Sequence, residues 1–321
     1  MTNNFFCPKC GQPLRLDLAV LRCDAHSFPV VESVPRFVES AGYTENFSFQ
    51  WNKYAKTQID HGTIEQSSRR LWRESGWSPA LLKDTKILEV GSGAGRFTSV
   101  LMSESECELV SVDYSEAVVA NYSNNRKYIE AGRLLLGQAS IYELPCKAQQ
   151  FDKVICLGVL QHTPDFKESV RQLYQRVRPG GELVIDFYPI KGWYTKLSAK
   201  YLLRPITRRL SPVTLHKVVR ATVPVSLNIY EGLVKLGLRP FTRFIPICDV
   251  EGTLPPGMAR EELLEWCELD TFDMFSPAFD SPQRISTVAR WLGEMGAVVR
   301  FADYVEVQPG NNAAVVRVTR P

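Results

Sequence analysis

Three glycines at alternate positions, Gly91, Gly93 and Gly95, could bind a small cofactor through the backbone. The apolar run before them, 87–90, predicts a buried strand, and the apolar spacing in 96–102 predicts a helix. Glycine between a strand and a helix N-terminus lets the backbone approach a ligand closely and adopt unusual dihedral angles. The segment therefore predicts a cofactor-binding turn.

The spacing of the glycines excludes two common nucleotide sites. A dinucleotide site has the pattern G-x-G-x-x-G, but here the third glycine comes one residue early and Arg96 occupies the expected position. A phosphate-binding loop would need Lys followed by Ser or Thr, which this turn lacks. The pattern is E-x-G-x-G-x-G from Glu89, which resembles the first motif of class I S-adenosylmethionine-dependent methyltransferases. Taken alone, the stretch also fits a glycine turn in another α/β protein.

Asp113 stands 22 residues after Gly91, at the end of a second predicted strand, 109–113. A carboxylate there can accept hydrogen bonds from both ribose hydroxyls of a nucleoside. Tyr114 could lie against the adenine, and Ser140 occupies the position where many family members have an Asp facing the adenine amino group. The cofactor-binding residues that the resemblance implies are Glu89, Gly91, Ser92, Gly93, Gly95, Asp113, Tyr114, Ser140, Ile141, Leu157 and Gly158.

Residues 151–165 resemble the fourth strand of the family and the loop after it, F-D-x-V followed by V-L-x-H. Leu157 and Gly158 should lie beside the methionine part of the cofactor, because open parallel sheets bind ligands at the carboxyl ends of their strands. His162, on the loop, is the candidate catalytic base for a hydroxyl acceptor. His162 could equally fix its loop or touch the cofactor.

The segments before the glycine turn and after the fifth strand could complete the pocket. By analogy with other methyltransferases, Gln50, Trp51 and Tyr54 could fold over the cofactor, although ordinary packing explains them as well. A helix is expected over 64–82. Other residues that could reach the acceptor or line the pocket are Asp186, Tyr188, Asp270, Asp273, Phe279 and Asp280.

Cys7, Cys10, Cys23 and His26 have the spacing C-x2-C-x12-C-x2-H, which suits a tetrahedral structural zinc site. A metal would explain how residues 5–38 fold with so few apolar side chains. The alternatives are reduced cysteines in a flexible tail, or water or the neighbouring aspartate as fourth ligand. The segment resembles the Trm112-like zinc-ribbon modules that precede some bacterial methyltransferases, which implies a structural or substrate-docking part.

Strand and helix alternate from 87 to 187, which predicts a parallel sheet with helices on both faces. A helix over 284–295 and strands over 298–307 and 313–319 follow, the strands joined by turn-forming residues. A C-terminal antiparallel hairpin is typical of the family, so we expect an α/β, Rossmann-like seven-stranded methyltransferase sheet. The expected parts are a zinc-ribbon module (1–39), a cofactor-binding domain (40–190 and 276–321) and a mainly helical cap that carries the substrate (191–275).

The first half of the insertion is basic. No Asp or Glu occurs from 187 to 230, and the apolar residues between its Lys and Arg side chains indicate helices with one apolar and one cationic side. Such a face would attract an anionic substrate group, a membrane surface or RNA. It could also be a solvated face whose neutralising acids lie elsewhere. The cations are Lys191, Lys196, Lys200, Arg204, Arg208, Arg209, Lys217 and Arg220.

The composition is ordinary for a globular protein of 321 residues, with 45% hydrophobic and 23% charged residues. A net charge of +3 does not by itself imply nucleic acid or membrane binding. We expect no membrane span, since no run of about 18 apolar residues is present. We expect no signal peptide, since no basic region followed by an apolar one occurs at the N-terminus. Three of eight cysteines cluster at the start and the rest are scattered, which favours a reducing, cytoplasmic location.

The leading hypothesis is an S-adenosylmethionine-dependent methyltransferase acting on a small-molecule, glycan-like or lipid-linked acceptor, with an anionic group held by the basic cap. A second is an rRNA or tRNA base methyltransferase whose zinc ribbon docks RNA. Against it, Leu157-Gly158-Val159-Leu160 stands where amino-group methylation needs N-P-P-[YF]. A third is a non-catalytic protein that binds the same cofactor. The sequence leaves the acceptor atom and the oligomeric state open.

Overall fold

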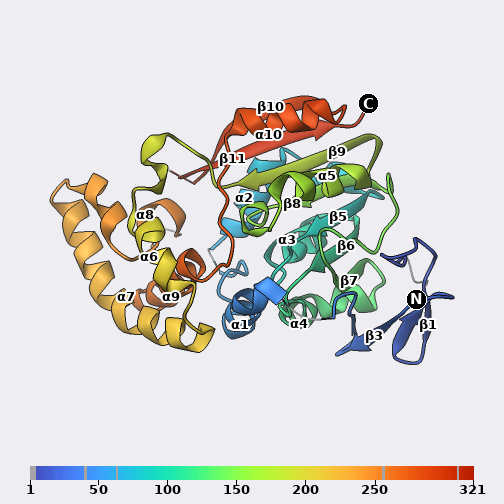
Figure 1. The fold of residues 1–321 in the computed structure, drawn as a ribbon, viewed down its shortest axis with the longest axis horizontal. Helices are drawn as coiled ribbons and strands as arrows, with labels where there is room; N and C mark the ends of the chain where they lie inside the picture. Colours follow the sequence, from blue (N-terminus) through green and yellow to red (C-terminus); the bar gives the residue numbers. More distant parts are fainter. Residues whose placement is uncertain (1–4, 40–41, 63, 255–256, 309–310) are drawn as a thin grey trace.

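The computed structural model describes residues 5–321 apart from 40–41, 63, 255–256 and 309–310, and it has three parts (Figure 1). The central part is a seven-stranded sheet of order β10-β11-β9-β8-β5-β6-β7, in which β10 and β11 run antiparallel to their neighbours. The expected α/β fold with a C-terminal antiparallel hairpin is therefore confirmed. Its strands are β5 (Lys86–Val90), β6 (Glu108–Asp113), β7 (Leu134–Gln138), β8 (Phe151–Cys156), β9 (Val177–Phe187), β10 (Val298–Gln308) and β11 (Asn311–Thr319).

Helices cover both faces of this sheet because its central strands are apolar on both sides. In β5, Ile87 belongs to a cluster with Phe97 and Leu101, whereas Leu88 packs in the cluster of Phe166 and other residues on the opposite face. The helices around the sheet are α1 (Glu45–Lys53), α2 (Gln66–Ser75), α3 (Arg96–Glu104), α4 (Val118–Glu130), α5 (Phe166–Arg176) and α10 (Ile285–Glu294).

One local expectation is wrong. The helix expected over 64–82 is two pieces, α2 and the 3₁₀ segment η2 (Pro79–Leu82), because Gly76 adopts a left-handed conformation and closes the first. A further irregularity is a bulge at 178–181 inside β9. Phe151 pairs with Val177 and Lys153 with Glu182, so the extra residues loop out without ending the strand.

The N-terminal part is a small antiparallel sheet, β1 (Arg15–Asp17), β2 (Val20–Arg22), β3 (Ser27–Val31) and β4 (Val34–Pro35). It lies beside the β7 edge of the large sheet (Figure 1). Arg36 donates a hydrogen bond to the side chain of Gln138 at 3.0 Å, and the Phe37 amide donates to the Gln138 carbonyl at 2.8 Å. The rings of Phe5 and Phe28 each pack at an angle against that of Phe37 with ring centroids 5.2 Å apart, so the two parts share a core.

The insertion forms a helical cap with its own core, which includes Leu215, Val219, Trp266 and Phe272. The outer helix α7 packs on α9 (Figure 1). None of the helices in the described ranges has the length and apolar character needed to cross a bilayer. The domain limits drawn from the sequence remain a prediction. The cap elements are η4 (Trp193–Lys196), α6 (Ala199–Thr207), α7 (Pro212–Lys235), η5 (Arg239–Phe244), α8 (Val250–Thr253) and α9 (Arg260–Phe275).

Candidate functional site

A cavity of about 510 Å³ lies where the carboxyl ends of the parallel strands meet α1 and the cap. This edge is where open parallel sheets bind ligands. The sheet supplies Gly91, Gly93 and Asp113 to its wall, α1 supplies Trp51, and the cap supplies Asp270. The cavity therefore joins the predicted cofactor turn to the predicted substrate part.

The glycine turn has no room for a side chain at two of its three glycines, Gly91 and Gly95. Gly91 and Gly95 have φ values of 84° and 89°. A Cβ at Gly91 would lie 2.2 Å from Val159, and one at Gly95 would lie 2.3 Å from the side-chain oxygen of Asn121. The Trp51 ring lies 3.4 Å from a Cβ built on Gly93, so α1 covers the turn from the cavity side. The sequence uses glycine here because both dihedral angle and space require it.

Asp113 is held firmly at the end of β6. Its carboxylate accepts hydrogen bonds from the Gly93 amide at 2.8 Å, the Ser115 amide at 2.7 Å and the Ser115 hydroxyl at 2.6 Å. Burial raises its pKa above the ordinary value. A carboxylate has about four acceptor positions, so capacity for a ligand hydroxyl remains. Asp113 ties the glycine turn to the next strand, and its ribose role stays a prediction.

Eight of the eleven predicted cofactor residues line the cavity, and three do not. Glu89 is buried behind the turn, where its carboxylate accepts hydrogen bonds from Thr98 and Ser111 and burial raises its pKa to about 7. Gly95 packs against Asn121, and Ser140 accepts a hydrogen bond from the Tyr142 amide at 3.2 Å. For Glu89, Gly95 and Ser140, the structure favours support of the cavity wall over direct contact.

His162 lies in the cavity wall on the 3₁₀ turn after β8 and is 5% exposed. Its Nδ1 is 3.1 Å from the Phe279 carbonyl, which can only accept, so Nδ1 carries the proton. Nε2 has no hydrogen-bond partner among the described residues. Burial lowers the pKa of His162, so the ring is neutral near pH 7. The rings of Phe47 and Tyr188 lie 5.4 and 5.5 Å from the imidazole and fix its position.

The cavity wall contains two further side chains without partners. Gln50 and Gln161 are both fully buried, and neither amide group has a hydrogen-bond partner in the part of the chain that the structure describes. An unpaired buried amide costs about 1–3 kcal/mol, so such groups are typical of sites that a polar ligand completes. With His162, they mark where an acceptor would find polar contacts.

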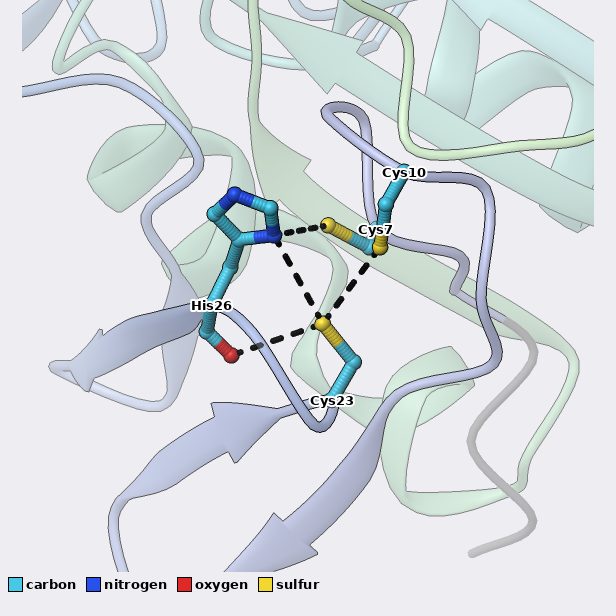
Figure 2. Close-up of side chains that lie close together, drawn as sticks. All are labelled: Cys7, Cys10, Cys23 and His26. Carbon is cyan, nitrogen blue, oxygen red and sulfur yellow. Dashed lines mark hydrogen bonds between the residues drawn. The ribbon is translucent and has the colours of Figure 1, made fainter.

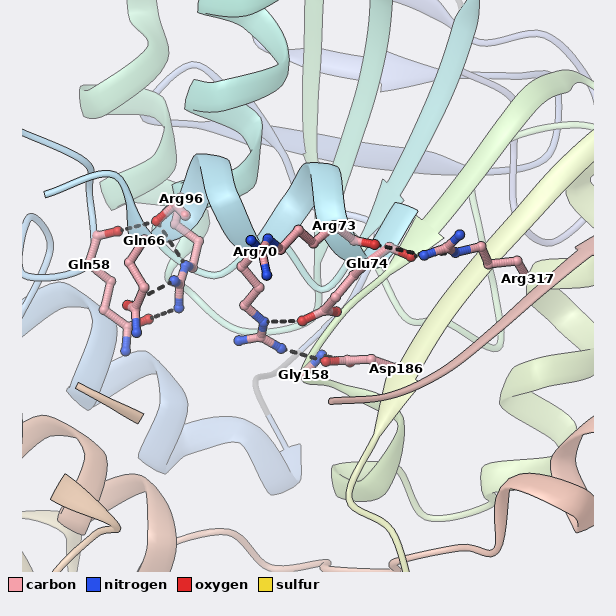
Figure 3. A network of polar contacts seen from close by, with 10 residues as sticks. Gln58, Gln66, Arg70, Arg73, Glu74, Arg96, Gly158, Asp186 and Arg317 are labelled. Atoms are coloured by element: carbon pink, nitrogen blue, oxygen red, sulfur yellow. Dashed lines mark hydrogen bonds and ion pairs between the residues drawn. The ribbon is translucent and has the colours of Figure 1, made fainter. Parts of the chain in front are cut away.

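Arg70 on α2 connects two buried carboxylates at the strand edge (Figure 3). It donates to Glu74 at 2.6 Å and to Asp186 at 2.5 Å, and Asp186 also accepts a hydrogen bond from the Gly158 amide. The network holds the loop after β8 against the end of β9. Sequence reasoning missed Arg70 and Glu74, since Arg70 is 116 positions from Asp186 and no local pattern distinguishes it.

The α1 helix joins the cavity to the cap through side chains. As predicted for the pocket, Gln50, Trp51 and Tyr54 all line it. The Tyr54 hydroxyl lies 2.8 Å from His216 Nε2 on α7 and donates to Glu268 on α9 at 3.2 Å. The sequence contained no signal for this connection.

The cap contributes carboxylates to the cavity. Asp270 and Asp273 line it, but Phe279 and Asp280, also predicted to line it, do not. Burial raises the pKa of Asp270 to about 7, and nearby Asp273 adds to this rise. Asp280 forms an ion pair with Lys200.

Two of the eight predicted surface cations face inward. Lys200 lies over the Tyr188 ring, 4.0 Å from its centroid, and pairs with Asp280. Arg204 is 7% exposed and donates to the carbonyls of Met274 and Pro277. The expectation of a single cationic side across the whole segment is therefore wrong for Lys200 and Arg204, since the buried carboxylate of Asp280, nearly 80 positions away, pairs with both of them.

The ligand atoms of Cys7, Cys10, Cys23 and His26 all lie within 4.8 Å of one another (Figure 2). Sulfur–nitrogen and sulfur–sulfur separations of 3.5, 3.6 and 3.8 Å occur among them. Zinc–sulfur bonds of about 2.3 Å in a tetrahedron place neighbouring ligand atoms about 3.8 Å apart, so the group has the size of a zinc shell.

Comparison with known proteins agrees with this geometry. A family model described as a methyltransferase domain matches residues 88–185. A ubiquinone biosynthesis O-methyltransferase of Pseudomonas entomophila is 28% identical over 179 residues, which cover 47% of this chain and 75% of the relative. A tRNA U34 carboxymethyltransferase of Pseudoalteromonas atlantica is 27% identical over 135 residues, which cover 41% of this chain and 42% of the relative. Among solved structures, the magnesium protoporphyrin IX methyltransferase of Synechocystis PCC 6803 with bound SAH aligns with a TM-score of 0.46 and 12% identity, over 87% of this chain and 97% of that one.

The matched segment runs from β5 to β9 and thus contains the glycine turn, Asp113 and His162. The sheet order, with its antiparallel β11 inserted beside β9, is the one expected for the family. The chain therefore contains a methyltransferase domain of the class I, S-adenosylmethionine-dependent type.

Proposed function

We propose that the chain transfers a methyl group from S-adenosylmethionine to an oxygen atom of a small-molecule or lipid-linked acceptor, with His162 as general base. The observation that carries this proposal is that Nε2 of His162, in the cavity wall, has no hydrogen-bond partner in the described part of the chain. A hydroxyl acceptor must lose its proton, whereas many nitrogen acceptors need no base. The relatives named as O-methyltransferases support an oxygen acceptor.

The residues present fit S-adenosylmethionine. Gly91 and Gly93 line the cavity beside Asp113, which would hold the ribose. Tyr114 and Ile141 would flank the adenine, and Leu157 and Gly158 the methionine part. When bound, the cofactor supplies a methyl group on a cationic sulfur leaving group. The protein then has mainly to align the acceptor oxygen with that methyl group.

His162 has the protonation state that a base needs. Nδ1 donates to the Phe279 carbonyl, so the lone pair is on Nε2, and burial keeps the ring neutral. Nε2 would take the acceptor's proton as the new carbon–oxygen bond forms, and the resulting cation could share charge with Asp273. Gln50 and Gln161 would orient the acceptor through their unpaired amides.

The substitution His162→Ala tests this role. We expect S-adenosylhomocysteine formation with a panel of phenolic and catecholic acceptors to fall about 10²–10⁴-fold. Calorimetric affinity for S-adenosylmethionine should stay within about twofold. A variant that keeps wild-type turnover would refute the base assignment. Transfer to tRNA by the wild type, without transfer to any hydroxyl acceptor, would favour the RNA hypothesis suggested by the tRNA-modifying relative.

We also propose a structural zinc ion in the N-terminal ribbon, bound by Cys7, Cys10, Cys23 and His26. The mutual distances of their ligand atoms and the shared core with Phe5 and Phe37 support it. With four protein ligands the ion would have no open position, so it would fold the ribbon and leave the chemistry to the cavity. Metal analysis should give about one zinc per chain, and Cys10→Ser should lower this content. Full zinc in the variant would exclude the site.

A further inference from the structure

Large apolar side chains are exposed on and beside three elements of the cap, η4, α6 and η5. Trp193 on η4 is 88% exposed, Ile206 on α6 is 65% exposed, and Phe241 on η5 is 56% exposed. Scattered exposed apolar residues are normal, but a group of this size is not. We call this group the cap apolar face, and its members are Trp193, Tyr194, Leu197, Leu202, Leu203, Ile206, Leu238, Phe241 and Phe244.

The elements that carry these side chains are neighbours in space. Both η4 and η5 contact α6. Arg243 on η5 donates a hydrogen bond to the Tyr194 carbonyl at 2.6 Å, and its guanidinium lies 5.6 Å from the Tyr194 ring centroid and 5.8 Å from that of Phe244. Residues about 50 positions apart therefore form one surface.

The same surface is cationic. The segment 187–230 contains no acidic residue, and Lys191, Lys196, Arg208 and Arg209 are exposed beside the apolar side chains. None of these four cations has an ion pair with any residue that the structure describes. Lys200 and Arg204 face inward. The outer face is therefore not uniformly basic but has apolar side chains between exposed cations.

We propose that the cap apolar face binds the surface of an anionic lipid bilayer. Exposed Trp and Tyr suit the bilayer interface, Leu, Ile and Phe can enter the acyl region, and Lys and Arg attract anionic headgroups. RNA would use the cations but would gain little from exposed leucine and isoleucine side chains. Because no helix in the described residues can span a bilayer, the chain would lie on the surface.

The position of the face gives this docking a consequence for the cavity. Tyr188, Pro189 and Lys200 line the cavity and belong to the segment that carries η4 and α6. A docked bilayer would therefore lie next to the cap side of the cavity. Such a position would favour an acceptor that resides in the membrane, and this consequence rests on the proposed methyl transfer. The docking itself does not depend on that proposal.

Vesicle flotation tests the docking without any acceptor. We expect the full-length protein to float with vesicles of phosphatidylcholine and phosphatidylglycerol (70:30) and to bind pure phosphatidylcholine at least tenfold less. The double variant Trp193→Ser/Ile206→Ser should lose at least tenfold in binding to the anionic vesicles. Arg208→Ser/Arg209→Ser should lose more than tenfold, since each cation near an anionic surface adds about fivefold.

Leu81→Ser is the matched control, because Leu81 is 78% exposed and lies on η2, outside the cap. It should bind vesicles as the wild type does. All variants should keep wild-type calorimetric affinity for S-adenosylmethionine, which shows that they are folded. Wild-type protein that stays unbound to both vesicles, binding unchanged by the cap variants, or salt-sensitive retention on RNA without flotation would each overturn the proposal.

Discussion

The two sides of the cavity are built differently. The side that would hold the cofactor, called the donor side, presents mainly backbone. The turn leaves no room for a Cβ at Gly91 or Gly95, and Asp113 is fixed by hydrogen bonds from Gly93 and Ser115. On the opposite side, which would hold the acceptor, α1, α9 and the loop after β8 present side chains, and Gln50, Gln161 and His162 each have a polar atom without a hydrogen-bond partner among the described residues. The donor side is thus specified by local sequence, whereas the acceptor side is specified by contacts between distant segments.

This difference implies that the two sides should fail in different ways. Substitutions on the donor side should change the shape of the cofactor-binding surface and should therefore weaken cofactor binding. Changes in the acceptor side should act through charge and protonation and should depend on pH. The hydrogen-bond network of Arg70 connects the two sides, so a substitution of Arg70 should lower the stability of the whole fold.

Arg70→Met should have the largest effect. It leaves the carboxylates of Glu74 and Asp186 buried without their cation, at a cost of about 3–5 kcal/mol in the free energy of unfolding. Urea denaturation measures this cost. Arg69→Met is the control, since Arg69 is exposed on the same helix and should change stability by less than about 0.5 kcal/mol. Equal effects of the two substitutions would refute the connecting role.

Gly91→Ala should weaken S-adenosylmethionine binding at least about a hundredfold in calorimetry. Its Cβ would lie 2.2 Å from Val159 and would have to displace the loop after β8. Gly132→Ala separates this clash from backbone strain, because Gly132 also has a positive φ of 75° but has nothing within 4 Å of its Cβ. Similar loss of binding in both variants would show that close approach at the turn is not the cause.

Asp113→Ala should weaken S-adenosylmethionine binding at least about tenfold, because it removes the predicted acceptor of the ribose hydroxyls. Ser115→Ala removes only one of the hydrogen bonds that orient Asp113 and should cost about threefold or less. Calorimetry at a single pH compares the two. An unchanged affinity for Asp113→Ala would remove the ribose assignment.

Asp270 should change stability only through its dependence on pH. Burial raises its folded pKa to about 7, above the unfolded value of about 3.8. The unfolded chain therefore releases the proton first, so stability falls as pH rises from about 4 to 7. Urea denaturation of Asp270→Asn should show a flatter pH dependence in that range, and a curve parallel to that of the wild type would contradict the shift.

The sequence predicts the donor side well because its signals are local. The apolar runs and alternate glycines predict the bounds of β5, α3 and β6 to within two residues. The cysteine spacing predicts the residues whose four ligand atoms lie close together in the structure. The same local signals do not show which residues touch the cofactor, since Glu89, Gly95 and Ser140 do not line the cavity. The roles of the individual cofactor residues remain predictions.

The acceptor side could not be predicted in the same way. The contact of Tyr54 with His216 joins residues 162 positions apart, and that of Gln58 with Asp270 joins residues 212 apart. Helical periodicity separates an apolar from a cationic side, but it does not show that Lys200 turns inward to Asp280. Such pairings depend on how helices pack, which spacing within one helix does not encode.

A crystal structure of the full chain with S-adenosylhomocysteine tests the central claim most directly. The account predicts the nucleoside across the turn at Gly93, with the ribose in hydrogen-bond distance of the Asp113 carboxylate and the sulfur facing the side of the cavity that holds His162. A ligand bound elsewhere, or a ribose without contact to Asp113, would contradict it.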